Sequence, residues 1–158
     1  MPTFLPQPRL RSRVVAIDIV DDPGGQRLVL PSTGAVLGFQ LRGRVRAGEE
    51  LLSVAGITGL QSGARTYSYQ DATSSVLVRF TAQGAACLGI PVAKLTGHSV
   101  ALADILPRAR VAELSERLQA APDQAACVAL VEELLLELPF ARDPVVSRAI
   151  ERLSASES

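Results

Sequence analysis

In VLVRFTAQGAACLGIP, residues Val76–Pro91, a strand pattern changes into a helix pattern within a few residues. Val76, Val78 and Phe80 occupy alternate positions, as in a strand with one buried face. An alanine-rich run with high helix propensity follows and ends at Gly89, where a glycine followed by a proline commonly terminates a helix. We therefore expect β-structure before this stretch and α-structure after it.

The residues before this stretch are typical of short strands separated by turns. The pattern indicates about seven strands at intervals of about ten residues, which is the signature of a sandwich or small barrel. Residues 9–20 are expected to form the first strand, because Arg9, Arg11 and Arg13 alternate with other residues ahead of a β-branched run. A later run, residues 65–70, should form another strand, joined by a turn to the strand that ends at Phe80.

The residues after Pro91 predict three helices. Apolar residues at spacings of three and four favour a helix over Ala109–Ala120. Asp123–Leu138 is the most apolar element and should be packed on two sides. Asp143 followed by Pro144 is a strong helix-start signal, an N-cap with proline at the first helical position.

These patterns predict a single domain of the α+β class spanning residues 1–158. Residues 12–80 should form a twisted antiparallel sheet that closes toward a barrel. Residues 82–106 should form short helices and loops, and residues 108–153 should form three helices packed beside the sheet. With 158 residues and 47% hydrophobic content, the chain can bury a core of its own.

Composition excludes several classes of function. Basic and acidic residues number sixteen each, so the chain has no excess positive charge to hold nucleic-acid phosphates. No apolar run approaches the roughly 20 residues needed to cross a bilayer, and the proline-rich start does not match a signal peptide. We therefore expect a cytoplasmic protein without a membrane partner.

The sequence offers no constellation of catalytic or metal-ligating residues. His98 is the single histidine, and no set of further metal ligands clusters around it in the sequence. Cys87 and Cys127 lie in helix-like settings that favour buried, reduced thiols over a disulfide or a metal cluster. We expect no catalytic residue, no metal and no cofactor, and hence not an enzyme.

A candidate ligand site can still be assigned to the inward face of the sheet. Tyr67 and Tyr69 share one face of a strand, where they could grip an organic ligand or simply cover the sheet. We place Phe39 and Leu41 on the same inward face. Arg79 interrupts an apolar strand, so it is either the anchor for an anionic ligand or one half of an internal ion pair.

The order of these features resembles a known family. The signals are, in order, VLP at 29–31, the strand around Phe39, VRF at 78–80, GAA at 84–86, GIP at 89–91, LT at 95–96, APD at 121–123 and a leucine-rich helix before DP at 143–144. This order is similar to the amino-terminal domain of one branch of the AraC-type transcriptional regulators. In that family a β-rich module and helices precede a pair of helix-turn-helix motifs.

The resemblance covers about residues 12–153 and implies a function. It implies a cupin-like partial barrel acting as the effector-sensing and dimerisation domain of a bacterial transcription regulator. A small-molecule effector and a homodimer are the partners it implies, and DNA would be bound only through a helix-turn-helix domain that these residues do not include. Glu132, Glu133 and Glu137 on the apolar second helix would repel phosphate, so we expect no specific DNA binding by this chain itself.

Two other classes of function stay open on the sequence. One is a protein–protein interaction module without a ligand, which the aromatic-poor composition allows. The other is an enzyme on a cupin-like barrel that binds a small molecule, but such an enzyme usually holds a metal with several histidines and a carboxylate. The single histidine argues against the enzyme.

Overall fold

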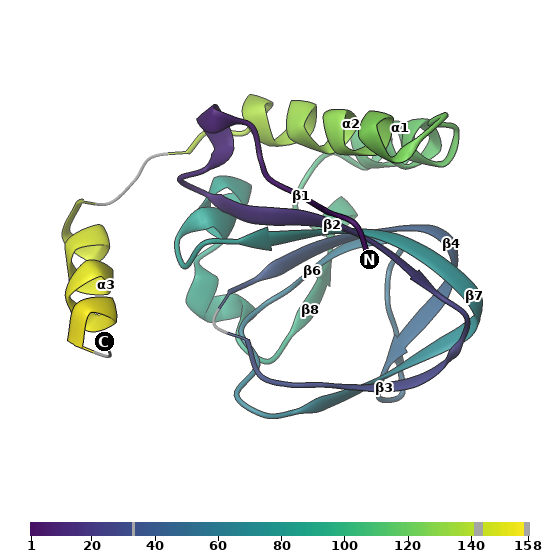
Figure 1. The fold of residues 1–158 in the computed structure, drawn as a ribbon, viewed down its shortest axis with the longest axis horizontal. Helices are drawn as coiled ribbons and strands as arrows, with labels where there is room; N and C mark the ends of the chain where they lie inside the picture. Colours follow the sequence, from purple (N-terminus) through teal and green to yellow (C-terminus); the bar gives the residue numbers. More distant parts are fainter. Residues whose placement is uncertain (33, 141–143, 157–158) are drawn as a thin grey trace.

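The computed structural model describes residues 1–32, 34–140 and 144–156 and has the α+β architecture expected from the sequence (Figure 1). In these residues an antiparallel sheet of eight strands curls without closing into a barrel, and three α-helices occupy the C-terminal part. The fold-class prediction is confirmed.

Strands that are consecutive in the chain are not always neighbours in the sheet. They are β1 (Thr3–Phe4), β2 (Val14–Asp22), β3 (Gly25–Val29), β4 (Val36–Ala47), β5 (Glu50–Leu51), β6 (Ala55–Thr58), β7 (Arg65–Phe80) and β8 (Ser99–Ala101). The order across the sheet is β1-β2-β7-β4-β6-β8, with β3 beside β7 and β5 beside β4. The sheet therefore extends beyond residues 12–80, because β1 and β8 join its two ends.

The long strand β7 organises the sheet. Its first part pairs with β3 and its second part with β2, while β4 runs beside both parts. The sequence predicted two strands here with a turn between them. Instead the chain continues through Asp71, whose φ of 57° is left-handed, opposite irregular pairing in β4 around Gly43 at φ 78°. A Cβ at Gly43 would lie 2.6 Å from Thr73 Cγ2, so the two strands bend together where only glycine fits.

The predicted first strand over residues 9–20 is wrong at its beginning. Pro8–Leu10 form a short 3-10 helix, η1, and the strand starts only at Val14. Proline at the first position of η1 favours this turn, and Leu10 is fully buried beneath it. Arg13 is buried as well, and its Nη1 donates to the carbonyl oxygens of Leu135 at 2.8 Å and Leu138 at 3.1 Å. Arg13 thus tethers the chain ahead of β2 to the end of α2, whereas Arg9 and Arg11 lie outside any strand.

The helices begin and end close to the predicted positions. They are the 3-10 helices η2 (Gly84–Leu88), η3 (Val92–Leu95) and η4 (Leu102–Asp104), followed by α1 (Arg108–Gln119), α2 (Gln124–Glu137) and α3 (Pro144–Ser156). Gly89 ends η2 with a left-handed φ of 76°, as expected. Asp123 is the N-cap of α2, and its carboxylate accepts a hydrogen bond from the Ala126 amide at 2.8 Å. Asp143, the predicted N-cap of the third helix, lies outside the described residues.

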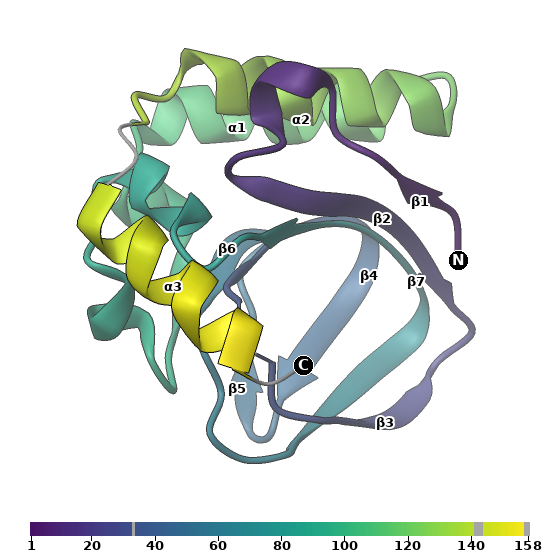
Figure 2. The same ribbon diagram turned by 60° about the vertical axis from the view of Figure 1, so that its left-hand side comes forward.

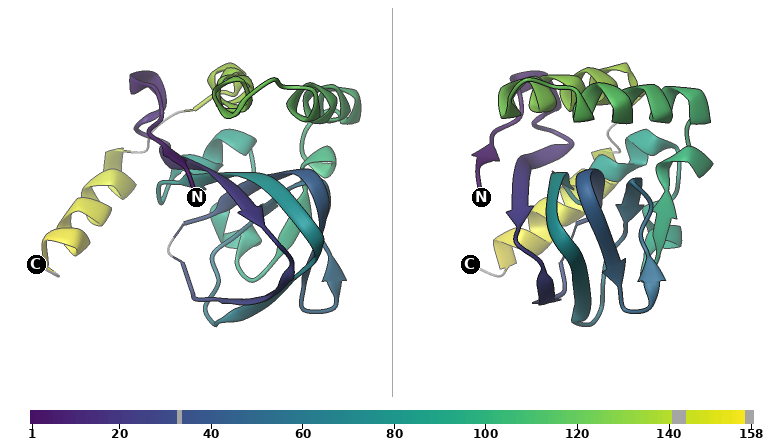
Figure 3. Two further views of the ribbon diagram at one scale, coloured as in Figure 1. Left: turned by 45° about the vertical axis from the view of Figure 1, so that its right-hand side comes forward. Right: turned by 90° about the vertical axis from the view of Figure 1, so that its right-hand side faces the viewer.

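The hydrophobic core lies between the outer face of the sheet and the helices α1 and α2, which lie side by side above it (Figure 3). On the sheet, Leu37 and Val78 are fully buried, and on α2 so are Val131 and Leu135. Each large apolar side chain of this kind stabilises the folded state by about 1.5–3 kcal/mol before entropy is subtracted. The apolar helix α2 is therefore central to the core, as its sequence predicted.

The sequence predicted that the third helix packs beside the sheet, but α3 lies away from it. Every side chain of α3 whose position is described is exposed, and the helix lies apart from α1 and α2 (Figures 1 and 2). Among the described residues the core takes members from α1 and α2 and none from α3.

A close backbone approach at Gly84 gives a first prediction about stability. A Cβ at this position would lie 1.9 Å from the Arg13 carbonyl oxygen, so Gly84→Ala must displace η2 or the start of β2. We expect a loss of about 1–3 kcal/mol in the free energy of unfolding, measured by urea denaturation. Gly63→Ala is the control, because a Cβ there meets nothing within 4 Å. Equal stability of the two variants would contradict the close approach.

Candidate functional site

The inner face of the curled sheet lines a cavity of about 230 Å³, which we call the inner cavity. Val20 of β2, Val36 of β4 and Leu77 of β7 give it an apolar wall. An apolar cavity of about 150 Å³ is large enough to hold benzene, so the inner cavity has room for a small organic molecule. Clefts of this kind, mostly apolar with a few polar groups, are where proteins bind small ligands.

Two glycines in adjacent strands leave this space open. Gly38 of β4 and Gly56 of β6 are paired in register, and Gly38 also pairs with Leu77 on its other side. All three line the inner cavity. A Cβ on Gly38 would lie 3.3 Å from Leu77 Cδ2, so even the smallest side chain would press on the cavity wall. The position of these glycines is therefore part of what makes a site.

The predicted tyrosines lie in the inner cavity. Tyr67 and Tyr69 line it from the first part of β7, beside Val45 of β4, which is the register partner of Tyr69. The pKa of Tyr69 is raised above the ordinary tyrosine value, mainly because the phenol is buried. The charge of Asp22 and the neighbouring Tyr67 raise this pKa further, while Arg27 lowers it. A neutral phenol in such surroundings can donate a hydrogen bond to a ligand.

Of the other two side chains predicted on that face, Phe39 lies in the cavity lining and Leu41 does not. Phe39 contributes to the lining but belongs to the hydrophobic core, and Leu41 packs against that core without lining the cavity. The sequence placed all four on one face. The irregular pairing of β4 between Gln40 and Arg44 changes the phase of the alternation, so that Val45 lies on the face opposite to Phe39. The first part of β4 thus packs in the core, and its second part lines the cavity.

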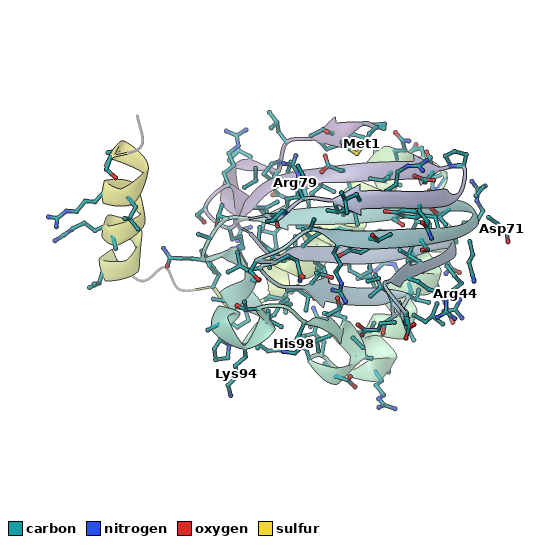
Figure 4. The ribbon with its side chains drawn as sticks, turned by 90° about the horizontal axis from the view of Figure 1, so that it is seen from below. Met1, Arg44, Asp71, Arg79, Lys94 and His98 are labelled. Atoms are coloured by element: carbon teal, nitrogen blue, oxygen red, sulfur yellow. The ribbon has the colours of Figure 1, made fainter. Side chains whose placement is uncertain are left out.

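Arg79 forms the internal ion pair that the sequence left open. Its Nε donates to Asp18 Oδ2 at 2.8 Å, and Thr3 Oγ1 donates to Asp18 Oδ1 at 2.7 Å. Asp18 is buried and Arg79 is half-exposed. Arg79 does not appear in the lining of the inner cavity, and Figure 4 shows it at the opposite end of the strands from Asp71 and Arg44.

A polar cluster that the sequence analysis missed lies at one side of the inner cavity. We call it the polar end; it comprises Glu50, Thr58, Arg65 and Ser99, from four different strands. Arg65 Nη2 donates to Glu50 Oε2 at 3.3 Å, and Nη1 donates to Ser99 Oγ at 3.4 Å. The hydroxyls of Ser99 and Thr58 lie 3.0 Å apart. Arg65 is two residues before Tyr67 in the same strand, and this alternation was the signal that could have identified it.

The inner cavity therefore has an apolar wall, two phenols and one charged end.

The predicted metal-ligand candidates lie apart from one another. His98 is exposed in the loop before β8, across the sheet from Arg79 in Figure 4. Cys87 and Cys127 are buried free thiols, and burial raises the pKa of both. In the part of the chain that the structure describes, no three His, Cys, Asp or Glu side chains gather in a way that could hold a metal ion.

Comparison of the chain with protein-family models and with curated proteins returned no match. None of the described helices is both long enough and apolar enough to span a bilayer.

The raised pKa of Tyr69 can be measured in a variant that retains a single phenol. The chain has two tyrosines, so Tyr67→Phe leaves Tyr69 alone to titrate in the ultraviolet spectrum. We expect its midpoint above about 10, and a return to about 10 after unfolding in urea. Because the folded-state pKa is the higher one, its contribution to stability is present below pH 10 and is lost as the pH rises through the folded value. A midpoint equal to that of the unfolded chain would show that Tyr69 is not buried in the cavity wall.

Proposed function

We propose that this chain is an effector-sensing domain of a bacterial AraC-type transcription regulator, and that its effector binds in the inner cavity. The observation that carries the proposal is the cavity itself, lined by Gly38, Gly56, Tyr67 and Tyr69. The resemblance of the order of sequence signals to that family supports the regulatory part.

The arrangement of the two faces of the sheet supports a sensing role. The same strands, β4 and β7, carry cavity residues on their inner face and core residues under α1 and α2 on their outer face. A ligand that shifts Leu77 therefore acts on a strand whose next residue, Val78, is packed in the core. A tightly packed core transmits such shifts because it has little free volume to absorb them.

A thermal-shift screen against small organic molecules tests the proposal. A ligand present at 100 times its dissociation constant stabilises the folded state by about 2.7 kcal/mol, which for a chain of this size is a rise in Tm of about 5–10 °C. We expect molecules with an apolar body and one polar group to produce such a rise. A broad screen in which no molecule raises the Tm would contradict the proposal.

Exposed leucines favour a second candidate, an interaction module that acts without a ligand. Leu28 of β3, Leu30 in the cavity lining and Leu153 on α3 are each about two-thirds exposed, and a partner could cover these apolar side chains. The partner we propose is a second copy of the chain, since the family resemblance implies a homodimer. Sedimentation at increasing protein concentration tests this. A dimer that forms without any response in the ligand screen would favour the second candidate.

We expect these 158 residues not to bind DNA specifically. The net charge is zero and α2 carries Glu132, Glu133 and Glu137, so phosphate contacts are disfavoured. Fluorescence anisotropy with duplexes of varied sequence at physiological salt is the measurement. Submicromolar affinity that depends on the DNA sequence would contradict this prediction.

A further inference from the structure

The two arginines of β7, Arg65 and Arg79, differ in how firmly they are held. Arg79 binds Asp18 at 2.8 Å, and the Asp18 side chain is only 4% exposed, so this pair is a fixed part of the sheet. Arg65 reaches Glu50 only at 3.3 Å and Ser99 only at 3.4 Å. A guanidinium carries five N–H donors, and the contacts with described residues engage two of those of Arg65. Of the two arginines of β7, Arg65 therefore lines the inner cavity and has N–H groups available to a ligand.

The surroundings of the Arg65–Glu50 pair allow another carboxylate to replace Glu50. The side chain of Arg65 is 22% exposed and lies in the cavity wall, whereas that of Glu50 is 53% exposed. An exposed carboxylate that leaves the pair is hydrated by water at little cost, and exposed ion pairs contribute little to stability. Arg65 would keep its place, because it extends from the same strand as Tyr67 with its Nη1 directed at Ser99.

We infer that the inner cavity binds a small monocarboxylate, whose apolar body lies against Leu77 and the tyrosines and whose carboxylate replaces Glu50 on Arg65. This inference rests on the proposed ligand-binding function and names the class of ligand. A planar guanidinium binds a carboxylate through two parallel N–H···O hydrogen bonds, which the long contact to Glu50 does not achieve. Scaling from a cavity of about 150 Å³ that holds benzene gives a ligand of about nine non-hydrogen atoms for the 230 Å³ available here.

Three probes that share one ring and differ in charge test the inference: benzoate, benzamide and benzylammonium. Isothermal titration calorimetry with the folded chain should show benzoate binding at least tenfold more tightly than benzamide, and benzylammonium binding most weakly. Arg65→Gln should remove the preference for benzoate while changing the affinity for benzamide less than twofold. Glu50→Gln should raise the affinity for benzoate several-fold, because the competing carboxylate is gone. Circular dichroism confirms that each variant is folded.

The control is Arg46→Gln, which removes an arginine that lies outside the cavity lining and donates to the Glu49 carbonyl oxygen. It should leave the affinity for benzoate unchanged, and a loss equal to that of Arg65→Gln would show a general charge effect and overturn the assignment. Equal binding of benzamide and benzoate would overturn the carboxylate inference and leave the proposed function standing. Tighter binding of benzylammonium would assign the anchor to Glu50 and also overturn it. If none of the three binds at millimolar concentration, the inference fails, and the thermal-shift screen decides separately on the proposed function.

Discussion

Replacing Arg13 by methionine is expected to lower the free energy of unfolding by about 3–4 kcal/mol. The buried guanidinium donates to the carbonyl oxygens of Leu135 and Leu138 at the C-terminal end of α2 and lies 5.0 Å from the centre of the Phe140 ring. Methionine fills much of the volume but leaves both carbonyl oxygens without their donor, and it removes a positive charge from the negative end of the helix dipole. Since whole domains are stable by only about 5–15 kcal/mol, this change alone threatens folding at 37 °C.

Urea denaturation measures this effect, and Arg11→Met is the matched control. Arg11 is exposed and makes one hydrogen bond at 3.3 Å to the Pro6 carbonyl oxygen, so its loss should cost less than about 0.5 kcal/mol. The Nε of Arg13 is buried without a partner among the described residues, which destabilises the folded state. Methionine removes this unpaired group, so the expected loss is smaller than the summed stabilisation by the hydrogen bonds and the ring contact of Arg13. A loss below about 1 kcal/mol for Arg13→Met would contradict the role assigned to this contact.

Replacing Gly38 by valine should abolish ligand binding while leaving the protein folded. The new side chain enters the inner cavity from the middle of β4, with its Cβ already 3.3 Å from Leu77 Cδ2. The backbone at Gly38 is ordinary extended strand, and valine is favoured over glycine in strands by up to about 1 kcal/mol. The contact with Leu77 opposes this gain, so we expect a folded variant that loses no more than about 1–3 kcal/mol in the free energy of unfolding. We also expect a loss of affinity of more than tenfold for any ligand that raises the Tm of the unmodified chain.

Equilibrium dialysis with such a ligand measures the loss. Gly63→Val is the control, because position 63 lies outside the cavity lining and a Cβ there meets no atom within 4 Å. Undiminished binding by a folded Gly38→Val variant would place the ligand somewhere other than the inner cavity.

The parts of this fold that depend on local chemistry could be predicted from the sequence. The periodicity of α2, the C-terminal signal at Gly89 and the strand around Val78 all correspond to the structure, because each depends on residues a few positions apart. The ends of α1 and α2 fall within one residue of the predicted ones for the same reason.

The features that the sequence did not predict depend on contacts between residues far apart in the chain. Arg13 contacts helix residues more than 120 positions away, and no local pattern distinguishes it from Arg11. The irregular pairing near Gly43 arises only when β4 lies beside the bend in β7, and it reverses which side of β4 faces the cavity. For this reason Tyr67 and Tyr69 lie in the cavity lining, while Leu41, which the sequence placed on the same face, packs against the core.

Binding of a small molecule in the inner cavity should change the fluorescence of the two tyrosines. The chain contains no tryptophan, and both tyrosines line the cavity, so its intrinsic emission reports on that site. Titration with a ligand from the thermal-shift screen should change the tyrosine emission in a saturable way, at the same concentrations that raise the Tm. The change should be absent in Gly38→Val and present in Gly63→Val. A ligand that raises the Tm and leaves the tyrosine emission unchanged at saturation would show that it binds elsewhere and would contradict binding in the inner cavity.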